Sequence, residues 1–195
     1  MTDLLLIGHG SRDPAATKEF GALVELVEAR LEGRRVGAGF LELAEPAIDV
    51  ALDALVTAGA DDVVAVPYVL FGAGHLKDDG PAVLGRARRR HPGVRFRLGR
   101  DLGTHPAVLD VAEERARAAL AALTERDPAG DTAVVLVGRG STDPDACAEM
   151  VKFARLLGDG RDLGLVEAAF VAMARPSVER ARGLPPALGP GAAAL

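Results

Sequence analysis

Several residue types are scarce in this chain, and each scarcity excludes a class of protein. One of the 195 residues is cysteine, Cys147, and none is tryptophan. A single cysteine excludes an internal disulfide and a thiolate-based zinc cluster. No apolar run approaches the roughly 20 residues that span a bilayer, and no basic stretch followed by an apolar run marks a signal peptide. We therefore expect a cytoplasmic protein without a membrane segment.

Positive charge is not in excess. Lysine and arginine together number 23 against 28 aspartates and glutamates, which gives a formal net charge of −5. Proteins that bind nucleic acid normally carry an excess of basic residues, so we expect no nucleic-acid partner. Hydrophobic residues make up 49% of the chain, which is ample for a packed core.

Short apolar runs alternate with helical patterns through the first part of the chain. The apolar runs predict strands at residues 4–7, 36–41, 63–70 and 94–98. This alternation predicts an α/β fold with a mostly parallel sheet and helices on both of its faces. In such folds the loops at the carboxyl ends of the strands form the ligand-binding edge.

Helix starts are marked by proline and by small polar residues. Helical spacing of apolar residues predicts helices that start near Pro14, Pro46, Val83 and Pro106. Asp13 and Thr104 are candidate N-caps, and a loop is expected at 71–80.

An internal repeat runs through the chain at a constant offset of 130 residues. "LLLIGHGSRD" (4–13) matches "VVLVGRGSTD" (134–143), and "FLELAEPAID" (40–49) matches "FVAMARPSVE" (170–179). Repetition without a gap over more than forty residues indicates that half of the chain was duplicated.

The two copies are expected to form two domains. The polar segment 124–131 is a candidate linker between a half at 1–123 and a half at 132–195. A counterpart of the third strand would fall at 193–200, whereas the chain ends at Leu195 in a low-complexity segment. We therefore expect the second half to be shortened and its sheet to be incomplete.

Candidate metal ligands follow the first three predicted strands. His9 follows the first, Glu42 and Glu45 the second, and His75 the third. Two imidazoles with nearby carboxylates suit a divalent ion such as cobalt, iron, nickel or zinc. Such a small set of protein ligands leaves some coordination positions of the metal open, as a catalytic site requires. The second half loses these groups, since His9 corresponds to Arg139 and Glu42 to Ala172.

Each candidate metal ligand could instead have a purely structural role. His9 could be a turn histidine, and His75 could belong to a solvated loop. Glu42 and Glu45 could be charges at the start of a helix, and Pro46 favours that role for Glu45.

Four other features are expected to be structural. His91 is expected at a helix end and His105 in a capping turn. The basic run at 86–90 is expected on a solvated helix face, and Cys147 in the core.

Three motifs occur in order: "LLLIGHGSRDPAA", "FLELAEPAI" and "VPYVLFGAGHLKDD". Together they resemble the CbiX/SirB family of sirohydrochlorin chelatases, the class II tetrapyrrole chelatases, over residues 3–123 and 134–180. The resemblance implies two flavodoxin-like halves and insertion of Co²⁺ or Fe²⁺, without ATP, into sirohydrochlorin in cobalamin or siroheme biosynthesis. It implies that His9, His75 and Glu42 bind the metal and carry the catalysis. Ni²⁺ or Zn²⁺ would suit the same ligands, and no organic cofactor is expected.

The substrate implied by this resemblance carries many carboxylates, so an acidic protein needs local cations to bind it. Arg12, Arg100 and Arg139 border strand ends and are candidate contacts, together with Ser11. A duplicated chain is expected to be a monomer, although an incomplete second half could recruit a partner to form a dimer.

Two other functions stay open from the sequence. One is a metal or tetrapyrrole carrier without catalytic activity. The other is a histidine phosphatase, although such sites need an arginine directly before the histidine and this chain has Gly8 there.

Overall fold

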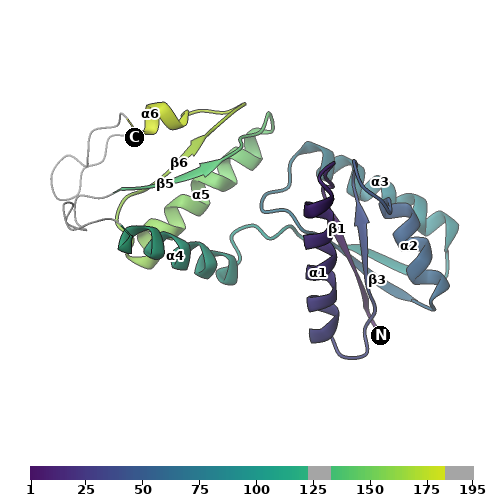
Figure 1. The fold of residues 1–195 in the computed structure, drawn as a ribbon. Helices are drawn as coiled ribbons and strands as arrows, with labels where there is room; N and C mark the ends of the chain where they lie inside the picture. The colour runs from purple at the N-terminus through teal and green to yellow at the C-terminus, as the bar shows by residue number, and fades with distance from the viewer. Residues whose placement is uncertain (123–132, 183–195) are drawn as a thin grey trace. The chain divides into compact units, whose positions relative to one another are not determined.

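A computed structural model of the chain describes residues 1–122 and 133–182 (Figure 1). The chain divides into two compact units, Met1–Leu102 and Gly103–Leu195. Each unit is an α/β structure with a parallel sheet, as the strand and helix patterns predicted. No helix in the described ranges is both long enough and apolar enough to cross a membrane.

The first unit contains a four-stranded parallel sheet in the order β2-β1-β3-β4. This order is that of flavodoxin-like sheets without their fifth strand. The strands begin and end within three residues of the positions that the apolar runs predicted. They are β1 (Asp3–Gly8), β2 (Val36–Phe40), β3 (Asp62–Pro67) and β4 (Arg95–Leu98).

Helices pack against the two faces of this sheet, and they bury different apolar sets. Helix α1 (Pro14–Arg30) places Phe20 and Val24 against one face, where they meet Leu6 and Phe40. Helices α2 (Ile48–Thr57) and α3 (Gly74–Arg90) cover the other face. The alternation of side chains along each strand therefore supplies both cores.

One predicted helix start and one predicted N-cap need correction. Helix α3 begins at Gly74, so most of the expected loop at 71–80 is helical. Glycine, two aspartates and Pro81 masked the helical pattern there, and Pro81 lies inside the helix, where proline is normally disfavoured. Asp13 caps α1 as predicted, whereas α4 (Pro106–Ala121) is capped by His105 and not by Thr104.

The basic run at 86–90 is not a purely solvated face. Arg86 Nη2 lies 2.6 Å from Asp49 Oδ2, and Arg90 Nη2 lies 2.9 Å from Asp49 Oδ1 and 3.0 Å from Asp53 Oδ1. His91 Nε2 lies 2.7 Å from the same Asp53 oxygen, so this histidine has the helix-end role that was expected. These contacts join α3 to α2.

This network predicts weakening of the first unit in acid. Burial alone would raise the pKa of Asp49, but hydrogen bonds from Arg86 and Arg90 outweigh it and hold the pKa below its ordinary value of 3.8. Burial also opposes ionisation of Asp53, and hydrogen bonds from His91 and Arg90 again lower its pKa. A lowered carboxyl pKa stabilises the fold above the ordinary value, and this stability is lost as pH falls through the lowered value.

We therefore expect Arg90→Ala to flatten the dependence of unfolding temperature on pH below about pH 4. The effect should be about 1 kcal/mol or less, because the partners are partly exposed to solvent. Thermal unfolding at pH 7 and pH 3 measures it, with Arg89→Ala as the control, since Arg89 is exposed and forms no ion pair within the described ranges. An unchanged pH dependence in Arg90→Ala would show that the network contributes nothing.

The second unit combines α4 with a smaller sheet. Strands β5 (Val134–Gly138) and β6 (Val166–Phe170) pair in parallel, and α5 (Pro144–Arg161) and α6 (Val178–Arg182) complete the described part. The expected linker at 124–131 and the expected tail lie outside the described residues. Cys147 is half-buried, and its thiol donates a hydrogen bond to the carbonyl oxygen of Ser141 at 3.3 Å.

Ion pairs of Arg161 hold helix α4 against α5. Arg161 Nη1 lies 2.6 Å from Asp110 Oδ1 and 2.7 Å from Glu113 Oε2. Its Nη2 also donates to the carbonyl oxygen of Pro106 at 3.2 Å. The helix that was expected to end the first half is thus held within the second unit.

The predicted repeat is present in the backbone of both units. Gly8 pairs with Phe40 across β1 and β2, and Gly138 pairs with Phe170 across β5 and β6. The same turn follows each first strand, because Ser11 and Ser141 each accept a hydrogen bond from an amide two residues later, at 3.0 Å. The two copies of the repeat therefore keep the same hydrogen bonds, although many of their side chains differ.

Candidate metal site

The carboxyl ends of three neighbouring strands meet at one edge of the first sheet. Gly8 at the end of β1 pairs with Phe40 at the end of β2, and Ile7 pairs with Pro67 at the end of β3. The residues that follow these strands therefore leave the sheet side by side. His9, Glu42 and Tyr68 are among them.

Backbone contacts fix the loops that carry His9 and Glu42. The amide of Leu41 donates to the carbonyl of Gly8 at 3.0 Å, and the amide of Glu42 donates to the carbonyl of His9 at 3.1 Å. Gly10 has a φ of +94°, and a β-carbon there would overlap the carbonyl oxygen of Glu42. Glycine at position 10 thus lets the two loops approach closely.

The side chains of His9 and Glu42 meet in front of these loops. His9 Nε2 lies 3.2 Å from Glu42 Oε1, and the two side chains are 50% and 56% exposed. An imidazole nitrogen and a carboxylate oxygen are both good ligands for a divalent transition metal, and donors this close can bind one ion. Their exposure leaves other coordination positions accessible from solvent.

The structure describes the backbone of His75 but not its side chain. It lies in the first turn of α3, in the connection that follows β3, so its expected position on a loop is wrong. The role of His75 as a metal ligand therefore stays a prediction. No group of three or more histidine, cysteine, aspartate or glutamate side chains with metal-binding geometry occurs among the residues that are described.

Glu45 and His105 have the structural roles that were the alternatives to a functional one. Glu45 Oε2 accepts a hydrogen bond from the amide of Ala47 at 2.9 Å, so Glu45 supports the start of α2, as Pro46 indicated. His105 Nδ1 accepts from the amide of Ala107 at 3.2 Å, which confirms its capping turn. Each of these residues thus uses one side-chain atom to support the start of a helix.

The residues that were predicted to contact the substrate are one serine in a turn and three exposed arginines. Ser11 Oγ accepts a hydrogen bond from the amide of Asp13 at 3.0 Å and so forms part of the turn after β1. Arg12 and Arg100 in the first unit and Arg139 in the second are exposed, and none forms an ion pair within the part of the chain that the structure describes. Three cationic groups are thus free to bind an anion.

Tyr68 was missed by the analysis of the sequence. Its amide donates to the carbonyl of Ile7 at 2.7 Å, which places it beside the end of β1. Its ring lies 5.8 Å from the ring of Phe20, and the residue is 45% exposed. Tyr68 is the single tyrosine of the chain and follows an apolar run, and this was the signal that the sequence offered.

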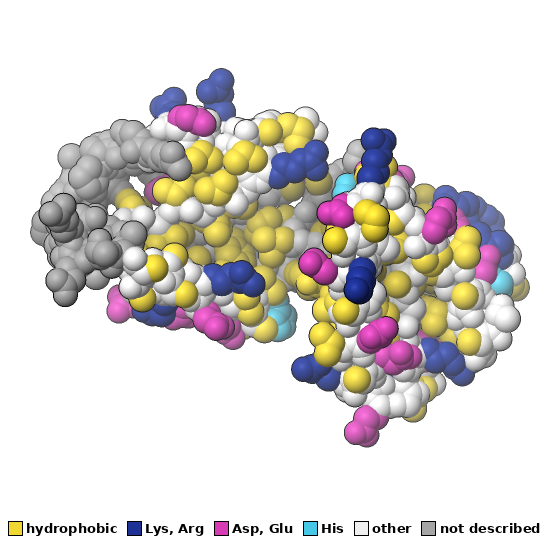
Figure 2. All heavy atoms as spheres, viewed as in Figure 1, with side chains coloured by type: hydrophobic (Ala, Val, Ile, Leu, Met, Phe, Trp, Pro, Cys, Tyr) yellow, Lys and Arg dark blue, Asp and Glu magenta, His cyan; other side chains and the backbone are white. Residues whose placement is uncertain are grey.

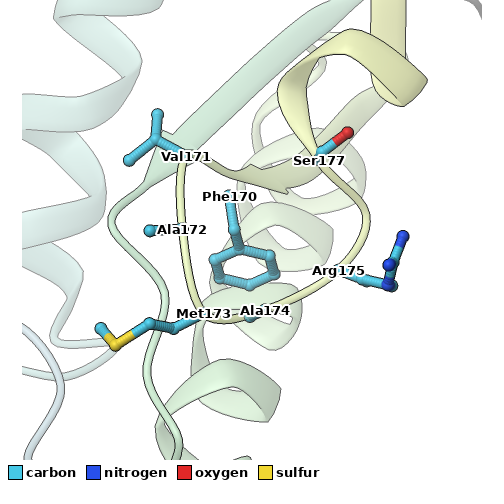
Figure 3. Close-up of a pocket in the computed structure, with 7 residues that line it drawn as sticks. All are labelled: Phe170, Val171, Ala172, Met173, Ala174, Arg175 and Ser177. Carbon is cyan, nitrogen blue, oxygen red and sulfur yellow. The ribbon is translucent and has the colours of Figure 1, made fainter.

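In the second unit, the loop equivalent to that of Glu42 borders an open cavity. The amide of Ala172 donates to the carbonyl of Arg139 at 3.0 Å, as Glu42 does to His9. A cavity of about 390 Å³ lies at this loop and is lined by Phe170, Val171, Ala172, Met173, Ala174, Arg175 and Ser177 (Figure 3). The backbone of the candidate metal site is therefore retained, while the residues equivalent to His9 and Glu42 are Arg139 and Ala172.

Known proteins of similar sequence carry two names. A sirohydrochlorin cobaltochelatase of Priestia megaterium is 35% identical over 187 residues, which are 92% of this chain and 58% of that protein. A sirohydrochlorin ferrochelatase of Bacillus subtilis is 34% identical over 154 residues, which are 79% of this chain and 57% of that protein. The chain thus spans less than two thirds of the length of these relatives.

Solved structures show the same fold. SirB from Bacillus subtilis with Fe³⁺ matches with a TM-score of 0.82 and 31% identity, over 92% of this chain and 69% of that chain. A cobalt complex of the sirohydrochlorin chelatase SirB from Bacillus subtilis subspecies spizizenii matches with a TM-score of 0.73 and 32% identity, over 86% and 66%. The CbiX family model matches residues 3–119 and 133–183, and so most of both units. The chain therefore belongs to the CbiX family.

Proposed function

We propose that this chain inserts a divalent metal ion, Co²⁺ or Fe²⁺, into sirohydrochlorin without ATP. The observation that carries the proposal is the separation of 3.2 Å between His9 Nε2 and Glu42 Oε1 at the ends of adjacent parallel strands. The names of the relatives, a cobaltochelatase and a ferrochelatase of sirohydrochlorin, support this substrate and these metals.

Metal insertion has two chemical requirements that this pair can meet. The ion must lose bound water while it stays held, and two pyrrole N–H groups of the macrocycle must lose their protons. A neutral imidazole at His9 can hold the ion, and the open positions of the metal can accept ring nitrogens. The Glu42 carboxylate can accept one proton when a ring nitrogen replaces it on the metal, and water at this exposed site can accept the other.

His75 is the proposed third ligand. It follows β3, the strand beside β1, and so starts from the same edge of the sheet as His9. Two imidazoles and one carboxylate favour cobalt, iron, nickel or zinc over magnesium, which prefers oxygen ligands. The metal is a substrate of the reaction, so a site that releases it to the ring is more useful than one that encloses it.

The free arginines are proposed to bind the carboxylates of the substrate. Arg12 is three residues from His9 in the sequence, and Arg139 occupies the position of His9 in the second unit. A guanidinium can bind a carboxylate through two parallel hydrogen bonds, which orients a ring as well as attracting it. Ser11 can still donate its hydroxyl proton, because its turn uses the oxygen only as an acceptor.

The decisive measurement is insertion of Co²⁺ into sirohydrochlorin, followed by absorbance, with substrate in excess over protein and with no ATP present. Many equivalents of cobalt-containing product per protein are expected. Product that stops at one equivalent, or tetrapyrrole binding without insertion, would instead identify a carrier. Absence of both binding and insertion would contradict the proposal.

A further inference from the structure

Tyr68 leaves the first sheet on the opposite side of β1 from Glu42. The amide of Glu42 donates to the carbonyl of His9 from the β2 side, and the amide of Tyr68 donates to the carbonyl of Ile7 at 2.7 Å from the β3 side. The turn that carries His9 therefore has the strand of the carboxylate on one side and the strand of the tyrosine on the other.

Two phenylalanine rings support the ring of Tyr68. The centroid of the Tyr68 ring lies 5.8 Å from that of Phe20, and the Phe20 centroid lies 5.1 Å from that of Phe40. Both separations are typical of favourable aromatic pairs. A β-carbon at Gly8 would lie within 3.2 Å of both phenylalanine rings. The row of three rings thus packs against the residue that precedes His9, and Tyr68 is its outer end.

Exposure alone does not distinguish Tyr68. Figure 2 shows apolar side chains at many places on the surface of the first unit, and single exposed apolar residues are normal. Tyr68 differs because it is 45% exposed while its ring is held against Phe20, whereas every phenylalanine in the described ranges is more buried. Its hydroxyl forms no hydrogen bond with a residue that the structure describes. An aromatic ring that is supported from behind and open in front is preorganised for a flat ligand.

A free cation lies in the loop beside Tyr68. The amide of Leu102 donates to the carbonyl of Val69 at 3.0 Å, so the loop after β4 runs next to the segment that follows β3. Arg100 belongs to this loop, is exposed and forms no ion pair within the described part of the unit. An aromatic ring with a guanidinium nearby suits a flat, conjugated ligand that carries carboxylates at its periphery.

We propose that Tyr68 is a binding residue for the metal-free tetrapyrrole in the first unit, and that its ring stacks on a face of the macrocycle. This inference rests on the proposed function and deepens it. Stacking orients a flat ring as well as attracting it, so Tyr68 selects for the macrocycle. The phenol is not a ligand of the metal in this proposal, so its removal affects the tetrapyrrole and leaves Co²⁺ binding intact.

Two substitutions separate the ring of Tyr68 from its hydroxyl. Tyr68→Leu keeps an apolar side chain on Phe20 but removes the flat ring, and it should raise the Kd for metal-free sirohydrochlorin about fivefold. Tyr68→Phe keeps the ring and should bind as the wild type does. Both variants should keep the wild-type Kd for Co²⁺. Titration followed by the absorbance of the tetrapyrrole, and by the visible bands of Co²⁺, gives the two constants.

A spectroscopic measurement tests the contact without a substitution. The chain has one tyrosine and no tryptophan, so incorporation of fluorotyrosine labels Tyr68 alone. The ring current of a conjugated macrocycle shields a nucleus that lies over its face. The fluorine resonance should therefore move strongly upfield when metal-free sirohydrochlorin is added. A resonance that does not move at saturating tetrapyrrole would overturn the stacking.

Matched controls remove exposed apolar surface elsewhere in the first unit. Leu26→Ala on α1 and Val50→Ala on α2 each shorten a side chain that is more than half exposed. Both should leave the Kd for sirohydrochlorin unchanged. Weaker binding in these variants would show that a general loss of apolar surface, and not the ring of Tyr68, is responsible.

The outcomes distinguish this inference from the proposed function. If the wild type inserts Co²⁺ and Tyr68→Leu binds sirohydrochlorin with wild-type affinity, the stacking is overturned and the proposed function stands. A loss in Tyr68→Phe as large as that in Tyr68→Leu, or a loss of Co²⁺ affinity in either variant, also overturns it. If the wild type does not bind sirohydrochlorin, both fail. Weaker binding of the tetrapyrrole in Tyr68→Leu alone is the expected result.

Discussion

Replacing His9 with alanine is expected to slow insertion of Co²⁺ into sirohydrochlorin by about 100-fold or more. Loss of a group that merely supports a metal ligand costs about 10- to 100-fold, and loss of the ligand itself should reach or exceed the upper end of that range. The imidazole is half-exposed, so its removal should not unfold the unit. Steady-state insertion followed by absorbance gives the rate.

A second measurement separates binding of the metal from the reaction. Co²⁺ bound to an imidazole and a carboxylate has visible absorption bands that respond to the number of ligands. His9→Ala should lose these bands at Co²⁺ concentrations that saturate the wild type. His75→Ala should behave in the same way if it is the third ligand.

His91→Ala is the matched control for the loss of a histidine. His91 lies in the same unit but contacts Asp53 at the end of α3, at 2.7 Å. Its replacement should lower the unfolding temperature slightly and leave the rate of insertion unchanged. A wild-type rate in His9→Ala would remove His9 from the site.

Gly10→Ala is expected to have the second large effect, although glycine offers no ligand. A β-carbon at this residue would overlap the Glu42 carbonyl oxygen, and the φ of +94° is unfavourable for alanine. The loop after β2 must therefore move, and the His9–Glu42 pair should separate. We expect a loss of about 3 kcal/mol in the unfolding free energy of the first unit. Chemical denaturation measures this loss, and the Co²⁺ spectrum reports the site.

Two other glycines make this prediction specific. Gly21 lies in α1 with no heavy atom within 4 Å of a β-carbon, so Gly21→Ala should stabilise the first unit by up to about 1 kcal/mol. Gly140 has a φ of +88° and meets the carbonyl of Ala172. Gly140→Ala should therefore destabilise the second unit while Co²⁺ binding by the first is unchanged. A Gly10→Ala protein as stable as the wild type would contradict the close approach of the loops.

The fold was largely predictable because its signals are local and mutually consistent. Continuous apolar runs marked all four strands of the first sheet, and Asp13 before Pro14 marked a helix start that the structure confirms. The start of α3 was not predictable in this way, because Gly74 and Pro81 lower helix propensity and the packing of later residues decides the outcome. Leu84 and Ala87 are buried in the core and hold this helix in place.

The candidate site was predictable as far as topology determines it. Parallel strands that are neighbours must release His9 and Glu42 at one edge, and the structure brings these two side chains together. The contact of Tyr68 with Phe20 depends on tertiary packing, and the left-handed backbone at Leu43 runs against residue preference. Neither the ring contact nor the backbone conformation follows from residue type and spacing, because each is imposed by the rest of the fold.

Helix α4 shows that the unit of duplication and the unit of folding are different in this chain. The helix precedes the second copy of the repeat, yet Arg161 joins it to α5, and its Leu109 and Ala116 are buried. A gene fragment cut within the polar segment would separate this helix from the residues that cover it and would leave apolar surface prone to aggregation. Domain swaps between such proteins should therefore be made near Leu102, before the helix begins.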